Sequence, residues 1–176
     1  MQELVITAVG PDRPGLVGKL TAPLYEASAN LADSRMVNLR GRFAVILLAE
    51  VPVGSLERVR GQLRTVADQL GLTLSFDDTA RAESPTVGVP LRLRIFAMDQ
   101  PGLVHRITDL LQRHGVNVEE LTTRSTPRAQ TGAPLFSMEL RITVPPALPI
   151  RTLRAELEQL CDELNCDLEL SQNGTH

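Results

Sequence analysis

The feature that most constrains this chain is an internal repeat. The hexapeptide Asp12-Arg-Pro-Gly-Leu-Val17 returns 87 positions later as Asp99-Gln-Pro-Gly-Leu-Val104. Each copy follows an apolar run typical of a strand and opens a run with the apolar spacing of a helix. The same offset pairs Thr21 with Thr108, Leu24 with Leu111 and Asn30 with Asn117. The 176 residues therefore predict two copies of one small unit rather than a single domain.

Hydrophobic periodicity predicts the same order of elements in both copies. In the first copy we expect strands at 4–9, 31–39, 43–51 and 72–76 and helices at 14–28 and 55–70, with Ser55 as an N-cap and Gly71 as a stop. In the second copy we expect strands at 91–97, 116–123, 135–144 and 167–170 and helices at 101–114 and 150–164. The order βαββαβ, found twice, predicts an α+β fold made of two tandem ferredoxin-like units.

The domain boundaries follow from the composition of the connecting segments. We expect the first domain at 1–78, a linker at 79–89, the second domain at 90–172 and a disordered tail at 173–176. The offset between the copies grows to 93 at Phe43 and Phe136, which places a six-residue insertion within 127–134. Its Gly and Pro residues predict an exposed loop.

The two predicted sheets differ in polarity. In the second copy Leu91, Leu93 and Ile95 alternate with Arg92 and Arg94, so one face of that sheet should be exposed to solvent. In the first copy, the runs at 5–9 and 43–49 are apolar on both faces. The unit's own helices can cover only one of these faces. We therefore expect a second chain or the sister domain to cover the other.

Composition excludes several classes of function. A formal charge of −3 and a pI near 5.6 disfavour direct nucleic-acid binding, which needs a clustered basic face. The longest apolar run, 43–49, is too short to span a membrane, and no export signal is visible, so we expect a cytoplasmic protein without a membrane partner. Cys161 and Cys166 cannot complete a zinc site without further ligands, and we expect free thiols, no metal and no cofactor.

Enzymatic motifs are also missing. No Gly-x-Ser-x-Gly, Walker or Gly-x-Gly-x-x-Gly sequence occurs, and His105, His114 and His176 are isolated along the chain. His105 lies close to the second hexapeptide but is expected to be a surface residue. The sequence therefore predicts a protein that is not an enzyme.

The residues at each strand–helix junction suit an amino-acid ligand. Pro14 lacks an N–H, Gly15 permits close approach, and the amides of the first helical turn attract a carboxylate. Asp12 could accept from a ligand ammonium or simply cap the helix, and Asn30 could bind the ligand or simply begin a strand. Arg13 against Gln100 predicts that the two junctions are not equivalent. The candidate ligand-binding residues are Asp12, Pro14, Gly15, Leu16, Asn30, Asp99, Pro101, Gly102, Leu103 and Asn117.

These motifs carry a family resemblance that covers nearly the whole chain. Units of βαββαβ order with Asp-x-Pro-Gly-Leu-Val at the first strand–helix junction and Asn at the start of the next strand resemble ACT domains, which are amino-acid-sensing modules. Two such units alone, with Gly10-Pro-Asp-Arg-Pro-Gly-Leu-Val17 and Asp33-Ser-Arg35, are similar to the glycine cleavage system transcriptional repressor family. The resemblance implies an amino-acid effector, glycine in particular, held between neighbouring domains.

The resulting expectation is a regulator of glycine cleavage or amino-acid metabolism that forms a homodimer. All predicted helices are used by the two units, so a repressor role should work through a protein partner and not by direct DNA binding. A trans-acting regulatory subunit of an amino-acid metabolic enzyme is the alternative, and a dimerisation module without a ligand is a third possibility.

Overall fold

The computed structural model describes residues 1–78, 87–127 and 134–172. The chain divides into two compact units, Met1–Glu83 (unit 1) and Ser84–His176 (unit 2). The predicted tail, residues 79–86 of the predicted linker and most of the predicted insertion loop lie outside the described residues. The exact domain boundaries accordingly stay a prediction.

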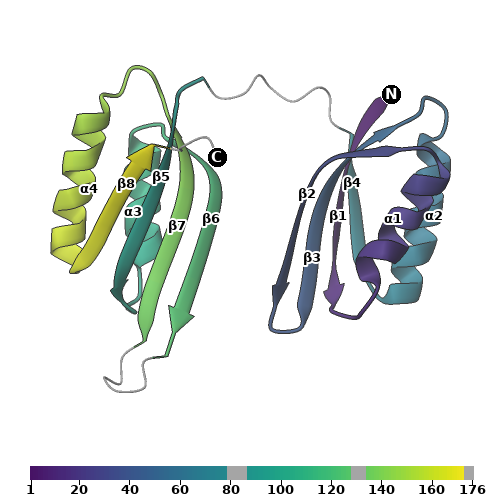
Figure 1. Cartoon of the computed structure of the whole chain (residues 1–176), viewed down its shortest axis with the longest axis horizontal. Helices are drawn as coiled ribbons and strands as arrows, with labels where there is room; N and C mark the ends of the chain where they lie inside the picture. The colour runs from purple at the N-terminus through teal and green to yellow at the C-terminus, as the bar shows by residue number, and fades with distance from the viewer. Residues whose placement is uncertain (79–86, 128–133, 173–176) are drawn as a thin grey trace. The chain divides into compact units, whose positions relative to one another are not determined.

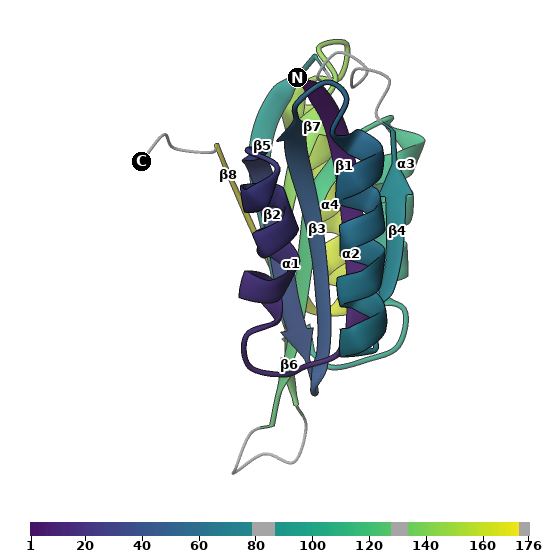
Figure 2. The same ribbon diagram turned by 90° about the vertical axis from the view of Figure 1, so that its right-hand side faces the viewer.

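Unit 1 is a four-stranded antiparallel sheet with two helices (Figure 1). Its strands lie in the order β2-β3-β1-β4, and both helices lie on the same face of the sheet (Figure 2). The elements in chain order are β1 (Gln2–Pro11), α1 (Leu16–Glu26), β2 (Asn30–Leu39), β3 (Arg42–Val51), α2 (Leu56–Leu70) and β4 (Thr73–Asp77).

Unit 2 repeats this arrangement with the strand order β6-β7-β5-β8. The predicted α+β class and the βαββαβ order are therefore confirmed in both units. The elements in chain order are β5 (Val89–Met98), α3 (Leu103–Arg113), β6 (Asn117–Thr126), β7 (Leu135–Val144), α4 (Ile150–Leu164) and β8 (Cys166–Gln172). Among the described residues, no helix combines the length and the apolarity that a membrane span requires.

Each unit has its own hydrophobic core between the sheet and the helices. In unit 1, alternate residues of β1 (Leu4, Ile6 and Ala8) are fully buried against the helices. Leu63 of α2 and its counterpart Leu157 of α4 are likewise 0% exposed in their respective units. Burying a leucine side chain stabilises the fold by about 2 kcal/mol, so these helix-facing positions determine the topology.

Two predictions about helix starts were wrong. The first helix was expected to begin at Pro14, but α1 begins at Leu16, because Gly15 has a φ of 86° and lies in the left-handed region. In unit 2 Gly102 has a φ of 90°, so α3 begins at Leu103 and not at Pro101. Ser55 does hold the N-cap position of α2, but its side chain makes no capping hydrogen bond.

The edge strands of both units contain a register shift at the same place. The pairing of β2 with β3 shifts between Leu31 and Asp33, and that of β6 with β7 shifts between Val118 and Glu120. One extra residue is left unpaired at such a bulge. Asp33 consequently pairs with Leu48, and its side chain lies on the sheet face away from the helices.

Candidate functional site

The β1–α1 turn of unit 1, residues Asp12 to Gly15, is exposed and ends at the first turn of α1. The N-cap of α1 is Gly15, and no side chain caps the helix. The Gly15 carbonyl oxygen accepts from the amide of Lys19 at 3.1 Å. The amides that precede Lys19 in the first turn therefore face a solvent-accessible position that favours negative charge. An α-carboxylate group is of the right charge for this position.

The carboxylate of Asp12 does not cap α1 but contacts the β2–β3 hairpin. Asn38 of β2 donates from Nδ2 to the Asp12 carboxylate, and the Asn38 Oδ1 atom accepts from the amide of Gly41 at 3.3 Å. The Asp12 amide in turn donates to the Gly41 carbonyl oxygen at 2.9 Å. The interpretation of Asp12 as a simple helix cap was therefore wrong, and Asp12 joins the turn to the end of β2.

The β5–α3 turn of unit 2 makes the corresponding contacts with different residues. Ser125 of β6 donates from Oγ to Asp99 Oδ2 at 2.8 Å, and the Asp99 amide donates to the Pro134 carbonyl oxygen at 3.0 Å. Gln100 adds a bond from Nε2 to the Leu164 carbonyl oxygen at the end of α4, at 2.7 Å. Sequence reasoning missed Asn38 and Ser125, although both are polar residues separated by the repeat offset of 87.

Two of the candidate residues are core residues. The side chains of Leu16 and Leu103 are 3% and 2% exposed and pack inside their units. Only their backbone amides, in the first turn of each helix, are available to a ligand. The exposed parts of the two turns are Asp12, Pro14 and Gly15 in unit 1 and Asp99, Pro101 and Gly102 in unit 2.

Asn30 and Asn117 lie at the opposite end of their units from these turns. Because β1 and β2 are both antiparallel to β3, β2 starts at the same end of the sheet as β1 (Figure 1). Asn30 pairs with Glu50 at that end. At about 3.3 Å per residue, the path along β2 from Asn30 to Asn38 spans roughly 25 Å. One free amino acid cannot contact both Asp12 and Asn30 of the same unit. The expectation that they act together within one unit was wrong.

A shallow hollow lies beside the start of the edge strand in each unit. In unit 2 it is bounded by α3 and β6 and includes Thr108, Gln112 and Asn117. The corresponding hollow of unit 1, between α1 and β2, includes Thr21, Tyr25 and Leu31. Neither hollow includes a residue of the β1–α1 turn or of the β5–α3 turn. The candidate residues of each unit are thus separated into the turn and the asparagine that starts the edge strand. Asn117 lines the hollow of unit 2, but Asn30 does not line the hollow of unit 1.

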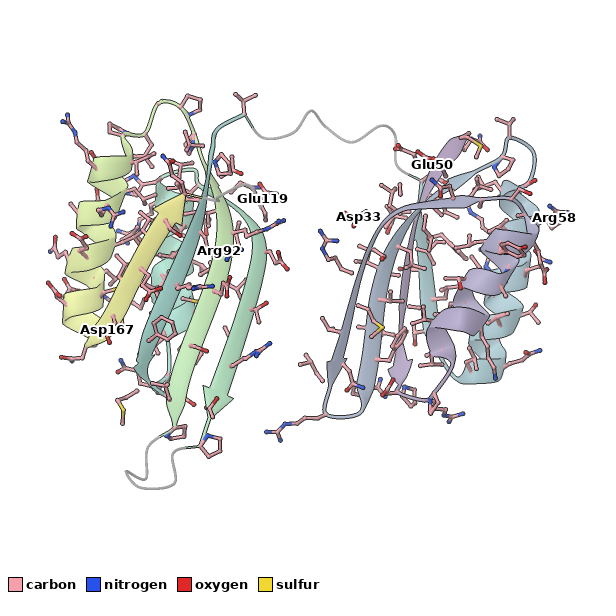
Figure 3. All side chains as sticks on the ribbon, in the orientation of Figure 1. Asp33, Glu50, Arg58, Arg92, Glu119 and Asp167 are labelled. Carbon is pink, nitrogen blue, oxygen red and sulfur yellow. The ribbon has the colours of Figure 1, made fainter. Side chains whose placement is uncertain are left out.

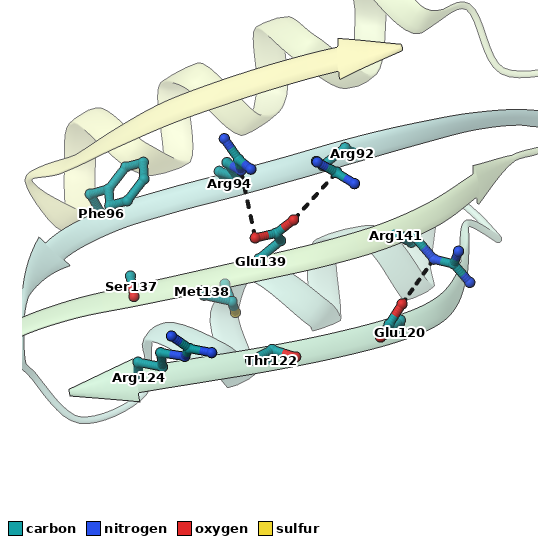
Figure 4. Close-up of a pocket in the computed structure, with 10 residues that line it drawn as sticks. All are labelled: Arg92, Arg94, Phe96, Glu120, Thr122, Arg124, Ser137, Met138, Glu139 and Arg141. Carbon is teal, nitrogen blue, oxygen red and sulfur yellow. Dashed lines mark ion pairs between the residues drawn. The ribbon is translucent and has the colours of Figure 1, made fainter. Parts of the chain in front are cut away.

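A third hollow, of about 530 Å³, lies on the face of the unit 2 sheet away from its helices (Figure 4). Glu139 in its centre lies 3.3 Å from Arg92 and 3.6 Å from Arg94, and Glu120 lies 3.0 Å from Arg141. Arg92 Nε makes no hydrogen bond, so its contact with Glu139 is Coulombic only. These side chains are 41% to 49% exposed, and such pairs contribute about 1 kcal/mol or less each.

The thiols and histidines offer no reactive site among the described residues. Burial, and then the neighbouring Cys166 thiol, raises the pKa of Cys161 to about 12, and burial also raises the pKa of Cys166. Both cysteines are therefore neutral near pH 7 and poor nucleophiles. His114 is not isolated as expected, because its Nε2 lies 2.8 Å from Glu156. Within the described ranges, no three His, Cys, Asp or Glu residues are grouped to hold a metal ion.

Comparison with known proteins matches each unit to a family. Models of the ACT domain match residues 2–77 and residues 91–162. The glycine cleavage system transcriptional repressor of Escherichia coli (strain K12) is 27% identical over 162 residues, which cover 92% of this chain and 85% of that protein.

Of two further similar proteins, one matches about half of the chain and the other matches nearly all of it. The UPF0237 protein MK1213 of Methanopyrus kandleri is 35% identical over 89 residues, which cover 47% of this chain and 96% of that protein. The crystal structure of an unknown protein from Galdieria sulphuraria superposes with a TM-score of 0.88 at 28% identity, covering 98% of this chain and 99% of that one.

Proposed function

Because this chain belongs to the ACT-domain family, with two such domains in tandem, we propose that it is a non-enzymatic regulator whose activity responds to an amino acid. A regulatory role is supported by its similarity, over 92% of the chain, to a protein named as a transcriptional repressor of the glycine cleavage system. The observation that carries the amino-acid response is the exposed turn that ends in an uncapped helix in each unit.

The proposed ligand lies with its carboxylate at the first turn of α1 or α3. Its ammonium group lies near Asp12 or Asp99, each of which still has lone pairs beyond its bond to Asn38 or Ser125. Asn30 and Asn117 contribute only if they come from a neighbouring ACT domain, since roughly 25 Å separates them from the turn of their own unit. The site is thus completed between two domains. Glycine is the proposed effector because of the relative's name.

A protein partner, rather than DNA, is the proposed target of this regulation. The formal charge of the chain is −3, which opposes binding to a polyphosphate. Each of the four described helices also buries an apolar side against its own sheet, leaving none of them free to enter a DNA groove. The partner is proposed to be a transcription activator or an enzyme of amino-acid metabolism.

The amino-acid response can be tested by thermal unfolding of the full chain with glycine and a panel of other amino acids. A ligand at about 100 times its dissociation constant adds about 2.7 kcal/mol to the stability of the native state, which raises Tm by several degrees. We expect Asp12→Ala or Asp99→Ala to abolish the shift and Asp109→Ala, on the exposed side of α3, to retain it. A panel without any shift would contradict the proposal.

The partner can be tested separately. Purified protein is expected to leave DNA from the control region of the glycine cleavage genes unshifted in an electrophoretic assay, and to shift it only together with a regulator that binds that DNA. Tight binding to this DNA by the protein alone would overturn the proposed route. Specific co-purification with a metabolic enzyme would identify the enzyme as the partner.

A further inference from the structure

The face of the unit 1 sheet away from its helices, which we call the open face of unit 1, is mostly apolar along the inner strands β1 and β3. The edge strand β2 carries the Asp33–Arg35 ion pair beside this apolar surface. Ile46 of β3 is 47% exposed, Val37 of β2 is 50% exposed, and Val9 of β1 is 37% exposed. Val5 and Leu48 lie opposite each other on the same face and line a hollow with Ile46. A contiguous apolar surface of this kind on a soluble unit marks an interaction site.

The fold itself does not require this surface, as the second unit demonstrates. At the positions equivalent to Val5, Ile46 and Leu48, unit 2 has Arg92, Glu139 and Arg141. Both sets occupy the same paired positions of β1 with β3 and of β5 with β7. The same topology therefore tolerates a charged open face. The apolar side chains of unit 1 need another explanation.

The two ends of the open face of unit 1 carry opposite charges. Glu3 and Glu50 are directly opposite each other in the β1–β3 pair, and Asp77 pairs with Val5 nearby. Like charges directly opposite each other destabilise a sheet unless a cation compensates them. Among the described residues, none of these three carboxylates makes an ion pair. Figure 3 shows Glu50 at this end of the sheet, together with Asp33.

The other end of the face is basic. Arg42 begins β3, pairs with Pro11 and Leu39, and has its side chain on the open face. Arg40 lies next to it in the two-residue turn of the β2–β3 hairpin. Within the described part of the chain, neither arginine has an ion-pair partner. A surface that is acidic at one end and basic at the other is complementary to itself when one copy is reversed.

We propose that a second copy of this chain covers the open face of unit 1, with the two faces packed around a two-fold axis and their strands antiparallel. Val5, Ile46 and Leu48 of both copies form the centre of the contact. Glu3 and Glu50 of one copy meet Arg40 and Arg42 of the other. The two-fold symmetry uses the same patch on both copies, as a closed dimer requires.

The size of the face is sufficient for a dimer of moderate stability. Four strands spaced about 4.8 Å apart, up to about 10 residues long at about 3.3 Å each, give a footprint of roughly 600 Å² per copy. The two copies together would bury roughly 1,200 Å², at the lower end of stable protein interfaces. Sheets that pack face to face interdigitate their side chains about 10 Å apart, which suits the short valine and isoleucine side chains here.

The apolar centre is tested by analytical ultracentrifugation of the full chain and of Ile46→Glu. The variant places in unit 1 the residue type that unit 2 has at this position, so the fold should accept it. We expect the wild type to be a dimer and Ile46→Glu to weaken it about 30-fold or more, as for a central interface residue. The matched control is Ser137→Glu on the open face of unit 2, which should leave the dimer unchanged.

The antiparallel arrangement is tested by charge reversal. Glu50→Arg alone and Arg42→Glu alone should each weaken the dimer a few-fold, and more strongly at low salt, because each brings like charges together. The double variant Glu50→Arg with Arg42→Glu should restore the affinity. If Glu50→Arg alone strengthens the dimer, the acidic ends face each other and the proposed arrangement is wrong.

Circular dichroism distinguishes a lost interface from a lost fold, since an unfolded Ile46→Glu would lose its strand and helix signal. In that case Val37→Lys, at an exposed position of the edge strand, repeats the test. A monomeric wild type, or a dimer that is indifferent to both apolar variants and to charge reversal, would overturn the proposal. The inference does not depend on an amino-acid effector, so the dimer can exist even if no amino acid shifts the Tm.

Discussion

The two units share one architecture but have opposite open faces. Strand order, the position of the bulge and the left-handed glycine before the first helix are the same in both. What differs is the sheet face away from the helices, which is apolar around Ile46 in unit 1 and charged around Glu139 in unit 2. The helix-facing side chains, which are apolar in both units, therefore specify the fold. The open face is then free to acquire a separate role in each unit.

The β1–α1 and β5–α3 turns differ in the contacts of the residue that follows the aspartate. In unit 2 Gln100 anchors the turn to the Leu164 carbonyl oxygen, but Arg13 at the equivalent position of unit 1 makes no hydrogen bond or ion pair within the described ranges. The turn of unit 1 therefore has fewer contacts to the rest of its unit. We expect it to adapt more easily to a ligand or to a neighbouring domain.

The largest effect is expected from truncating the equivalent core leucines. Leu63→Ala and Leu157→Ala each remove a fully buried side chain and should cost about 2 to 5 kcal/mol, in unit 1 and in unit 2 respectively. Hydrogen exchange measured by mass spectrometry should report faster exchange only in the altered unit. Gln69→Ala, on the exposed side of α2, is the control. Equal acceleration in both units would mean that they unfold as a single cooperative block.

A smaller effect is expected at the two left-handed glycines. Gly15→Ala and Gly102→Ala should each cost about 1 to 2 kcal/mol, because an added Cβ meets no atom within 4 Å but the positive φ is strained. Thermal unfolding measures the cost. Gly18→Ala, inside α1 and also in open space, should instead stabilise the helix by about 0.5 to 1 kcal/mol. A neutral Gly15→Ala would show that the turn can relax.

The smallest effect is expected on the charged open face of unit 2. Glu139→Gln removes the contacts to Arg92 and Arg94 and should cost about 1 kcal/mol or less, because these side chains are 41% to 45% exposed. The cost should shrink when salt is raised from ~0.05 M to ~0.5 M, as measured by urea unfolding. Thr122→Ala in the same hollow should cost no more in low salt than in high salt. A salt-independent loss for Glu139→Gln would indicate packing instead of charge.

The fold could be predicted from the sequence because its determinants are local and repeated. The apolar spacing of Leu56, Val59 and Leu63 and the alternation of Leu91, Leu93 and Ile95 both correspond to buried faces in the structure. Element ends were less predictable. Proline is common at the first position of a helix, which predicted starts at Pro14 and Pro101. The left-handed backbone conformation of the following glycine instead makes each helix begin two residues later.

The candidate site could be predicted only in part. The β1–α1 and β5–α3 turns could be predicted because Asp-x-Pro-Gly repeats as a contiguous motif. The distances from Asp12 to Asn30 and to Asn38 depend on strand direction. β2 starts at the end of the sheet where β1 starts and runs parallel to it, so Asn38 and not Asn30 lies beside Asp12, and the sequence alone does not show this direction. Polar partners from another strand, such as Ser125 for Asp99, become apparent only when the sheet register is known.

The bulges in β2 and β6 also determine where the chain can change its length. Beyond the bulge, Asp33 pairs with Leu48 and Arg35 pairs with Ile46, and deleting one residue from this regularly paired part of β2 would move each later side chain to the other face of the sheet. Such a deletion should be worse than almost any substitution in the strand, whereas removing the unpaired bulge residue itself would leave the later pairing unchanged. The two copies agree with this, since their offset stays at 87 from Asp12 through Asn30 and grows only beyond the edge strand. Insertions and deletions are tolerated in the connection that follows the strand, not within it.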